Sequence, residues 1–312
     1  MQDNDPLKSV ADSPVVRVKN LRKTFGDTVA VEDVSFDVRP GEVFGLLGPN
    51  GAGKTTTIRM MLDIFKPDAG AIEIFGGPLT AAGRDRIGYM PEERGLYPHM
   101  RVIDCLAYLG KLKGLSGQQA RRRAVTYLQR LELAGQEGTK IEALSRGMTQ
   151  KVQVIAAILH RPDLLIIDEP FANLDPVNSQ LVRDILLEMR NEGKSVIMTS
   201  HQLALVETLC DRIAMIHYGR VILLGTVAQV RRDHAGNVLR LHGSGQIDAP
   251  PGVLHVERRN ASEWLLTLEP GTDHRAVLQI LMTANGFSLD GFELARPTLD
   301  EIFVQIVRES RQ

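Results

Sequence analysis

The sequence has 312 residues, which is more than one compact domain usually needs and enough for two. Its formal net charge of -1 gives no strong global field toward nucleic acid or anionic lipid, so we expect no nucleic-acid partner. Residues 1–14 form a polar, acidic segment without the apolar core of a secretory signal, and no apolar run reaches the ~20 residues that span a bilayer, so we expect a cytoplasmic protein with a flexible N-terminal tail.

The first predicted strands precede the most informative motif of the chain. Residues 15–19 and 34–38 alternate apolar and polar side chains, as a half-buried strand does. Residues 43–47 are continuously apolar, which is typical of a strand that is buried on both faces. A predicted helix begins at about residue 55 and includes residues 55–62.

Between that strand and that helix lies the run G-P-N-G-A-G-K-T-T, which fits the phosphate-binding pattern G-x-x-x-x-G-K-[ST]. Its glycines permit positive φ, so that backbone N–H groups can converge on phosphates at a helix N-terminus. Lys54 is expected to reach the β- and γ-phosphates, and the Thr55 hydroxyl to ligate Mg²⁺. We therefore predict that a nucleotide and its magnesium bind at Gly48, Pro49, Asn50, Gly51, Ala52, Gly53, Lys54, Thr55 and Thr56.

The elements that follow predict an α/β core. Further strands are expected at 71–75 and 86–90, and a helical pattern runs from about 93 to 160. Three more apolar strands and a helix come next, at 163–167, 177–192 (the helix), 195–199 and 212–217. Continuously apolar strands that alternate with helices indicate a parallel sheet covered on both faces.

Two carboxylates end the predicted strand at 163–167. Asp168 and Glu169 follow it directly, and ligands of parallel sheets bind at the carboxyl ends of the strands. Asp168 can hold Mg²⁺ through water, and Glu169 can polarise a water for in-line attack on a phosphate. A helix N-cap is the structural alternative for the same carboxylates.

After Gly225 the pattern changes to a small α+β domain. We expect strands at 238–242, 253–256, 264–268 and about 287–293, with helices at 274–284 and 298–309. The predicted organisation is a tail at 1–14, a first domain at 15–225 and an accessory domain at 226–312.

Several ordered motifs in residues 15–225 resemble the nucleotide-binding subunit of an ABC transporter. L-S-R-G-M at 144–148 resembles the family signature, normally L-S-G-G-Q, and A-N-L-D at 172–175 resembles the D-loop. His201 resembles the switch histidine, Phe25 the aromatic that stacks on adenine, and Glu92 stands where the family normally has Gln. The resemblance implies an α/β P-loop NTPase core with an antiparallel β subdomain and an α-helical subdomain inserted at about 93–160.

The resemblance also implies the roles of individual residues. Glu169, His201 and Lys54 would be catalytic, and Thr55, Asp168 and Glu92 would hold Mg²⁺. Ser145, Gly147 and Asp175 would contact ATP that is held by a second copy of the chain, which makes ATP part of the interface of a head-to-tail dimer. Arg146 and Met148 depart from the signature, and Glu92 cannot donate hydrogen bonds as Gln does, so we expect hydrolysis that is active and slower.

A narrower resemblance concerns the type of transporter and the direction of transport. Residues 89–98, the signature and P-T-L-D-E-I-F at 297–303 resemble ABC-2 type exporter ATPases, including the sodium-extrusion group. This implies export through a separate membrane permease that docks near the Glu92 loop and residues 93–115, so that the protein lies on the inner face of the cell membrane. Leu96, Tyr97 and Met100 fit either this contact or the core of the helical subdomain.

Two other functional classes remain open at this point. A soluble ABC ATPase that acts on nucleic acid or ribosomes is one, although such proteins usually carry two cassettes or a long coiled coil, neither of which this sequence has. The other is a regulatory ATP-binding module whose C-terminal domain senses a ligand, against which the intact Glu169 argues.

Overall fold

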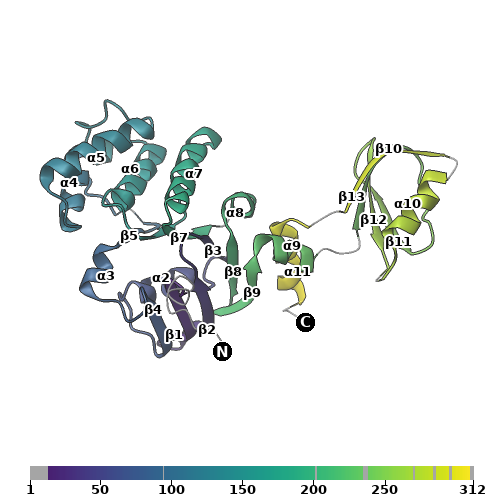
Figure 1. The fold of residues 1–312 in the computed structure, drawn as a ribbon, viewed down its shortest axis with the longest axis horizontal. Coiled ribbons are helices and arrows are strands. Elements are labelled where there is room, and N and C mark those ends of the chain that lie inside the picture. The colour runs from purple at the N-terminus through teal and green to yellow at the C-terminus, as the bar shows by residue number, and fades with distance from the viewer. Residues whose placement is uncertain are drawn as a thin grey trace, which may run out of the picture. The chain divides into compact units, whose positions relative to one another are not determined.

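The computed structural model describes residues 13–93, 95–200, 202–234, 238–269, 271–283, 286–294 and 297–309. The chain forms two compact units, Met1–Val227 and Ala228–Gln312 (Figure 1). Within the described parts of the chain, no helix has the length and apolar character that crossing a membrane requires.

The first unit is built on a nine-stranded sheet with the order β4-β1-β2-β9-β8-β3-β7-β6-β5. Five of its strands form parallel pairs, with β5 at the edge of the sheet, and they are buried along nearly their whole length, which fits their mainly apolar sequences. These strands are β3 (Val43–Leu47), β5 (Ile87–Met90), β6 (Leu164–Asp168), β7 (Ser195–Ser200) and β8 (Arg212–His217). The predicted α/β fold class is therefore confirmed.

The other end of the sheet is mainly antiparallel. β1 pairs with both β2 and β4 in antiparallel registers, and β8 pairs with β9 in the same way. These strands are β1 (Val16–Phe25), β2 (Thr28–Val38), β4 (Ala69–Ile74) and β9 (Arg220–Thr226). Alternate residues of β1 and β2 are buried, so one face packs on the core and the other stays open, as alternation in the sequence predicts.

The helices of the first unit connect its strands, and three of them form a separate group. α2 (Lys54–Met61) follows β3, and α7 (Pro176–Asn191) follows β6. α4, α5 and α6 pack on one another and form the helical subdomain between β5 and β6 (Figure 1). The remaining bounds are α3 (Ala81–Asp85), α4 (Val102–Leu112), α5 (Gly117–Arg130), η1 (Ile141–Ala143), α6 (Arg146–Ile158) and α8 (Leu203–Leu209), with α9 (Val227–Asp233) at the junction of the units.

The second unit has its own antiparallel sheet with the order β11-β12-β10-β13. Its core contains Leu239, Leu241 and Trp264 from the sheet and Val277 and Leu281 from α10. The elements are β10 (Val238–Gly245), β11 (Val253–Arg258), β12 (Glu263–Leu268), α10 (His274–Thr283), β13 (Phe287–Leu294) and α11 (Leu299–Glu309). This is the α+β architecture that the sequence predicts.

Candidate functional site

The loop between β3 and α2 has a backbone that only glycine can adopt at two positions. Gly48 and Gly53 have φ values of 143° and 107°. A Cβ atom on Gly48 would lie 2.1 Å from the Ile216 carbonyl oxygen, and one on Gly53 would lie 2.5 Å from that of Ala30. The loop therefore keeps its conformation and its close approach to β2 and β8 only with these glycines.

Lys54 lies at the start of α2 with its side chain buried. Its Nζ donates hydrogen bonds to the carbonyl oxygens of Gly48 at 2.7 Å and Pro49 at 3.1 Å. Burial lowers the pKa of Lys54, and the charges of Glu169, Asp168 and Glu92 oppose that shift. The ammonium group is thus held over the loop, where a bound anion would compensate its desolvation.

Two carboxylates from the end of β6 face this loop. Asp168 is almost fully buried, and its Oδ2 lies 3.3 Å from the Thr55 hydroxyl oxygen, which donates to it. Its Oδ1 accepts a hydrogen bond from the Thr199 hydroxyl of β7. Glu169 is the next residue, 9% exposed, with a left-handed φ of 52°.

These groups line one pocket of about 380 Å³. The sequence predicted most of its lining: Asn50, Gly51, Ala52, Gly53, Lys54, Thr55, Thr56, Glu92, Asp168 and Glu169. Thr28, Val29 and Ala30 of β2 also line it, and sequence reasoning missed them because nothing in an alternating strand indicates proximity to a distant loop. Main-chain donors, an ammonium group and carboxylates around such a volume suit a polyphosphate with a metal ion.

The donor set fits Mg²⁺ in particular. Among the described residues, no group of three or more His, Cys, Asp or Glu side chains could hold a metal ion alone. Mg²⁺ usually binds through one or two protein oxygens together with phosphate oxygens and water. Thr55 and Asp168 supply such oxygens side by side. Glu92 adds a further carboxylate to the pocket, beside those of Asp168 and Glu169.

Phe25 ends β1 directly opposite Thr28, the first pocket residue of β2. Its ring is 43% exposed and meets the Phe65 ring edge-on, with the centroids 5.2 Å apart. The Lys23 ammonium lies 5.5 Å from the Phe25 centroid. The ring is therefore oriented by its neighbours and still accessible, which is what stacking on a base requires.

The signature and D-loop residues do not line this pocket. Ser145 caps α6 by accepting a hydrogen bond from the Met148 N–H, and Asp175 caps α7 by accepting one from the Asn178 N–H. The hydrogen bond from the Asn178 N–H, followed by one from the Asn178 side chain, lowers the pKa of Asp175. A Cβ atom on Gly147 would lie 3.0 Å from the Asn173 carbonyl oxygen, so the two segments are adjacent. His201, the predicted switch histidine, lies outside the described residues.

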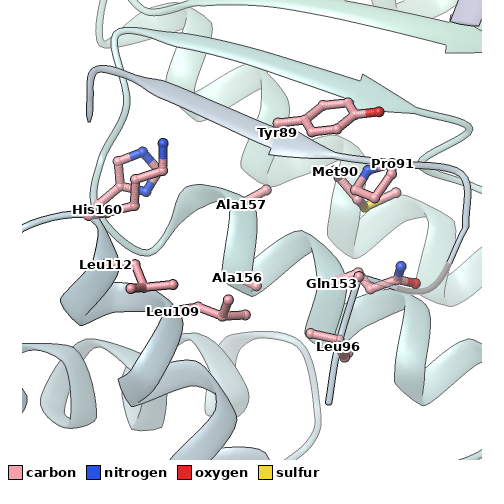
Figure 2. A pocket seen from close by; sticks show the side chains of 12 residues that line it. Tyr89, Met90, Pro91, Leu96, Leu109, Leu112, Gln153, Ala156, Ala157 and His160 are labelled. Carbon is pink, nitrogen blue, oxygen red and sulfur yellow. The ribbon is translucent and has the colours of Figure 1, made fainter. Parts of the chain in front are cut away.

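A second, apolar recess of about 290 Å³ lies between β5, α4 and α6. Figure 2 shows His160 at one end and Leu96 and Gln153 at the other, with Leu109 and Leu112 of α4 across from Ala156 of α6. Leu96 belongs to the core at 7% exposed, whereas Tyr97 is 45% exposed and packs edge-on against Tyr108. The three residues near the Glu92 loop therefore differ in burial: Leu96 is buried, Tyr97 is exposed and Met100 is half-buried.

Each of the two units matches a known family model. Residues 31–172 match the model described as ABC transporter. Residues 225–307 match the model described as the C-terminal domain of ATP-binding proteins like DrrA1-3.

Individual proteins agree with the family models. The chain is 36% identical to the ABC transporter ATP-binding protein YhaQ of Bacillus subtilis (strain 168), over 94% of this chain and 98% of that protein. It is 33% identical to the linearmycin resistance ATP-binding protein LnrL of the same organism, with the same coverage. A solved ATP-binding subunit of an ABC transporter superposes with a TM-score of 0.66 at 34% identity, over 70% of this chain and 92% of that one.

Proposed function

Because the chain belongs to the ABC transporter ATP-binding proteins, we propose that it powers export through a separate membrane permease, as one half of an ATP-dependent head-to-tail dimer. As a member of this family, the chain binds and hydrolyses ATP. The observation that carries the proposal is the convergence of Lys54, Thr55, Asp168 and Glu169 on one pocket.

The arrangement of this pocket supports a division of roles in hydrolysis. Lys54 and the loop N–H groups bind and orient the β- and γ-phosphates, and Phe25 stacks on the adenine. Thr55 and Asp168, with Glu92, would hold Mg²⁺, which would neutralise charge on the phosphates. Glu169 accepts the proton of the attacking water at its carboxylate. The role of His201 rests on the family resemblance alone, by which it would orient that water and the γ-phosphate.

The dimer is supported by the location of the signature residues. Ser145, Gly147 and Asp175 lie at the N-termini of α6 and α7 and outside the lining of their own nucleotide pocket. A helix N-terminus capped by Ser145 is suited to bind an oxyanion. We infer that they contact the γ-phosphate bound by the second copy, so that ATP closes the dimer and hydrolysis reopens it.

An exposed apolar surface supports a membrane partner. Tyr97, Tyr108 and Leu112 are 45%, 42% and 59% exposed, and Leu112 also lines the recess in Figure 2. A cluster of exposed aromatic and aliphatic side chains beside a recess is typical of an interface. An ABC-2 type permease would dock here and hold the protein on the inner face of the membrane. The resistance protein among the relatives supports export as the direction.

The test of the catalytic part uses two substitutions. Glu169→Gln should bind Mg-ATP, lose hydrolysis and accumulate as dimers, whereas Lys54→Ala should bind ATP poorly. Light scattering after size exclusion, with EDTA as the control, measures the dimer. Hydrolysis by Glu169→Gln at the unaltered rate would exclude Glu169 as the base, and a monomer at saturating Mg-ATP would exclude the shared site.

The test of the partner is a pull-down of tagged Glu169→Gln from detergent-solubilised native membranes with Mg-ATP. A polytopic membrane protein should co-purify, and Leu112→Ser should reduce its yield without changing the ATP affinity. Leu254→Ser is the matched control, because Leu254 is 61% exposed in the second unit. Recovery of ribosomes or DNA complexes alone would favour a soluble ABC ATPase instead.

A further inference from the structure

The backbone of Glu169 has an unusual conformation for a residue with a side chain. Its φ of 52° falls in the left-handed region, which residues other than Gly, Asn and Asp seldom adopt. Such a conformation persists only where surrounding groups hold it. The direction of the Glu169 carboxylate depends on this backbone, so the groups that hold the backbone also position the carboxylate.

Two buried side chains bond to the backbone of Glu169. The Glu169 N–H donates to the Thr199 hydroxyl oxygen at 3.1 Å, and Gln150 Nε2 donates to the Glu169 carbonyl oxygen at 2.8 Å. Thr199 is fully buried, and Gln150 is 7% exposed. Buried polar groups without such partners would be costly, so both bonds favour this one conformation.

The Thr199 hydroxyl has a second role. It accepts a hydrogen bond from the Glu169 N–H and donates one to Asp168 Oδ1, so one hydroxyl acts as acceptor and as donor. Thr199 lies directly across from Asp168 in the parallel pairing of β6 and β7. The hydroxyl therefore holds the Asp168 carboxylate directly, and it holds Glu169 through its backbone N–H.

We propose that Thr199 and Gln150 are positioning residues that clamp the Glu169 peptide from β7 and from α6 and so aim its carboxylate at the γ-phosphate. The inference rests on the proposed role of Glu169 in hydrolysis. Gln150 lies on the same helix that begins after Ser145, so the clamp also joins the catalytic carboxylate to the signature helix. Neither residue lines the nucleotide pocket.

The experiment compares the ATPase kinetics of Thr199→Val, Thr199→Ser and Gln150→Met with those of the unaltered full-length protein. Valine keeps the shape of threonine without the hydroxyl, serine keeps the hydroxyl, and methionine keeps the length of glutamine without its N–H donors. Thr199→Val and Gln150→Met should each lower kcat about 10- to 100-fold, because a small misplacement of a catalytic group has effects of that size. KM should change less than about threefold, and Thr199→Ser should restore kcat.

Ser195→Ala is the matched control for general damage to β7. Ser195 is also buried, and its hydroxyl accepts from the Gly41 N–H and donates to the Arg39 carbonyl, both at 3.1 Å, at the opposite end of the strand. This variant should unfold at a lower temperature and keep its kcat. If Ser195→Ala lowers kcat as much as Thr199→Val does, the positioning role is wrong.

Three further outcomes test this inference separately from the proposed function of Glu169. Hydrolysis by Glu169→Gln at the unaltered rate would remove the proposed function of Glu169 as the base, on which the clamp rests. An inactive Glu169→Gln together with a fully active Thr199→Val would leave that function intact and overturn only the clamp. Recovery of Thr199→Val at high Mg²⁺ would show that Thr199 acts through Asp168 alone, which would also overturn the clamp on Glu169.

Discussion

At the scale of single residues, His160 gives a prediction for the pH dependence of stability. Its Nε2 lies 3.1 Å from the Ile87 carbonyl oxygen, and its Nδ1 is buried without a partner among the described residues. Burial, followed by the charge of Lys113, lowers the pKa of His160 from 6.5 to about 4. Between these values the unfolded chain binds a proton that the folded chain does not, so stability falls as the pH falls.

The measurement is urea unfolding at pH 7 and at pH 5, for the unaltered protein and for His160→Gln. Glutamine keeps an N–H donor for Ile87 and does not titrate. The unaltered protein should lose about 1–2 kcal/mol more between the two pH values than the variant does, because the full pKa shift of His160 gives about 1.8 kcal/mol over this range and its partial exposure lowers that figure. Equal losses in both proteins would exclude His160 as the source.

The residues of the site differ in how well the sequence predicts them. Lys54, Thr55 and Asp168 are predictable because their chemistry demands a fixed spacing or a strand end. Thr199 was not predicted, because a threonine inside an apolar strand is also a common β-branched packing residue. Gln150 was missed for a similar reason: a glutamine within a helix carries no signal that its partner is a backbone carbonyl nineteen positions later.

At the scale of elements, two helix caps give a matched pair of variants. Ser145 caps α6, and Ser116 caps α5 in a reciprocal capping box with Gln119. Replacing either serine with alanine should lower the free energy of unfolding by about 1 kcal/mol, since each removes one side-chain acceptor from a helix N-terminus.

The two caps should differ in their effect on catalysis. Ser145→Ala should also lower the ATPase rate, because Ser145 is proposed to contact the partner's γ-phosphate, whereas Ser116→Ala should not. Denaturant unfolding and steady-state kinetics on both variants make the comparison. An unchanged rate in Ser145→Ala at a normal dimer level would assign Ser145 a purely structural role.

The elements that the sequence missed are short or irregular. β9 and the helices α3 and α8 were not predicted, and each has at most seven residues, too few for a periodic pattern to emerge. β1 extends to Phe25, beyond the predicted end at residue 19, because three register shifts against β2 interrupt its alternation. The strands β6 and β7 are no longer, with five and six residues, but each is an uninterrupted, fully buried and mainly apolar run, and that run predicts them.

At the scale of the whole molecule, the two units have separate cores. One cluster includes Phe36, Phe44 and Ile166 in the first unit, and the other surrounds Trp264 in the second. Trp264 is the one tryptophan in the sequence, 3% exposed, with its ring edge-on to Phe287 at a centroid distance of 5.1 Å. Its fluorescence therefore reports on the second core, whereas far-UV circular dichroism is dominated by the larger first unit.

This arrangement predicts that denaturation is not a single two-state transition. In urea, the fluorescence of Trp264 and the circular dichroism should have different midpoints, because each core can be lost by itself. Mg-ATP added to Glu169→Gln at about 100 times its Kd should stabilise the first unit by about 2.7 kcal/mol, since it binds only that folded unit. The circular dichroism transition should therefore move to higher urea while the Trp264 transition stays in place. Coincident transitions that move together with Mg-ATP would instead mean that the two cores unfold as one cooperative unit, and that nucleotide binding also stabilises the second unit.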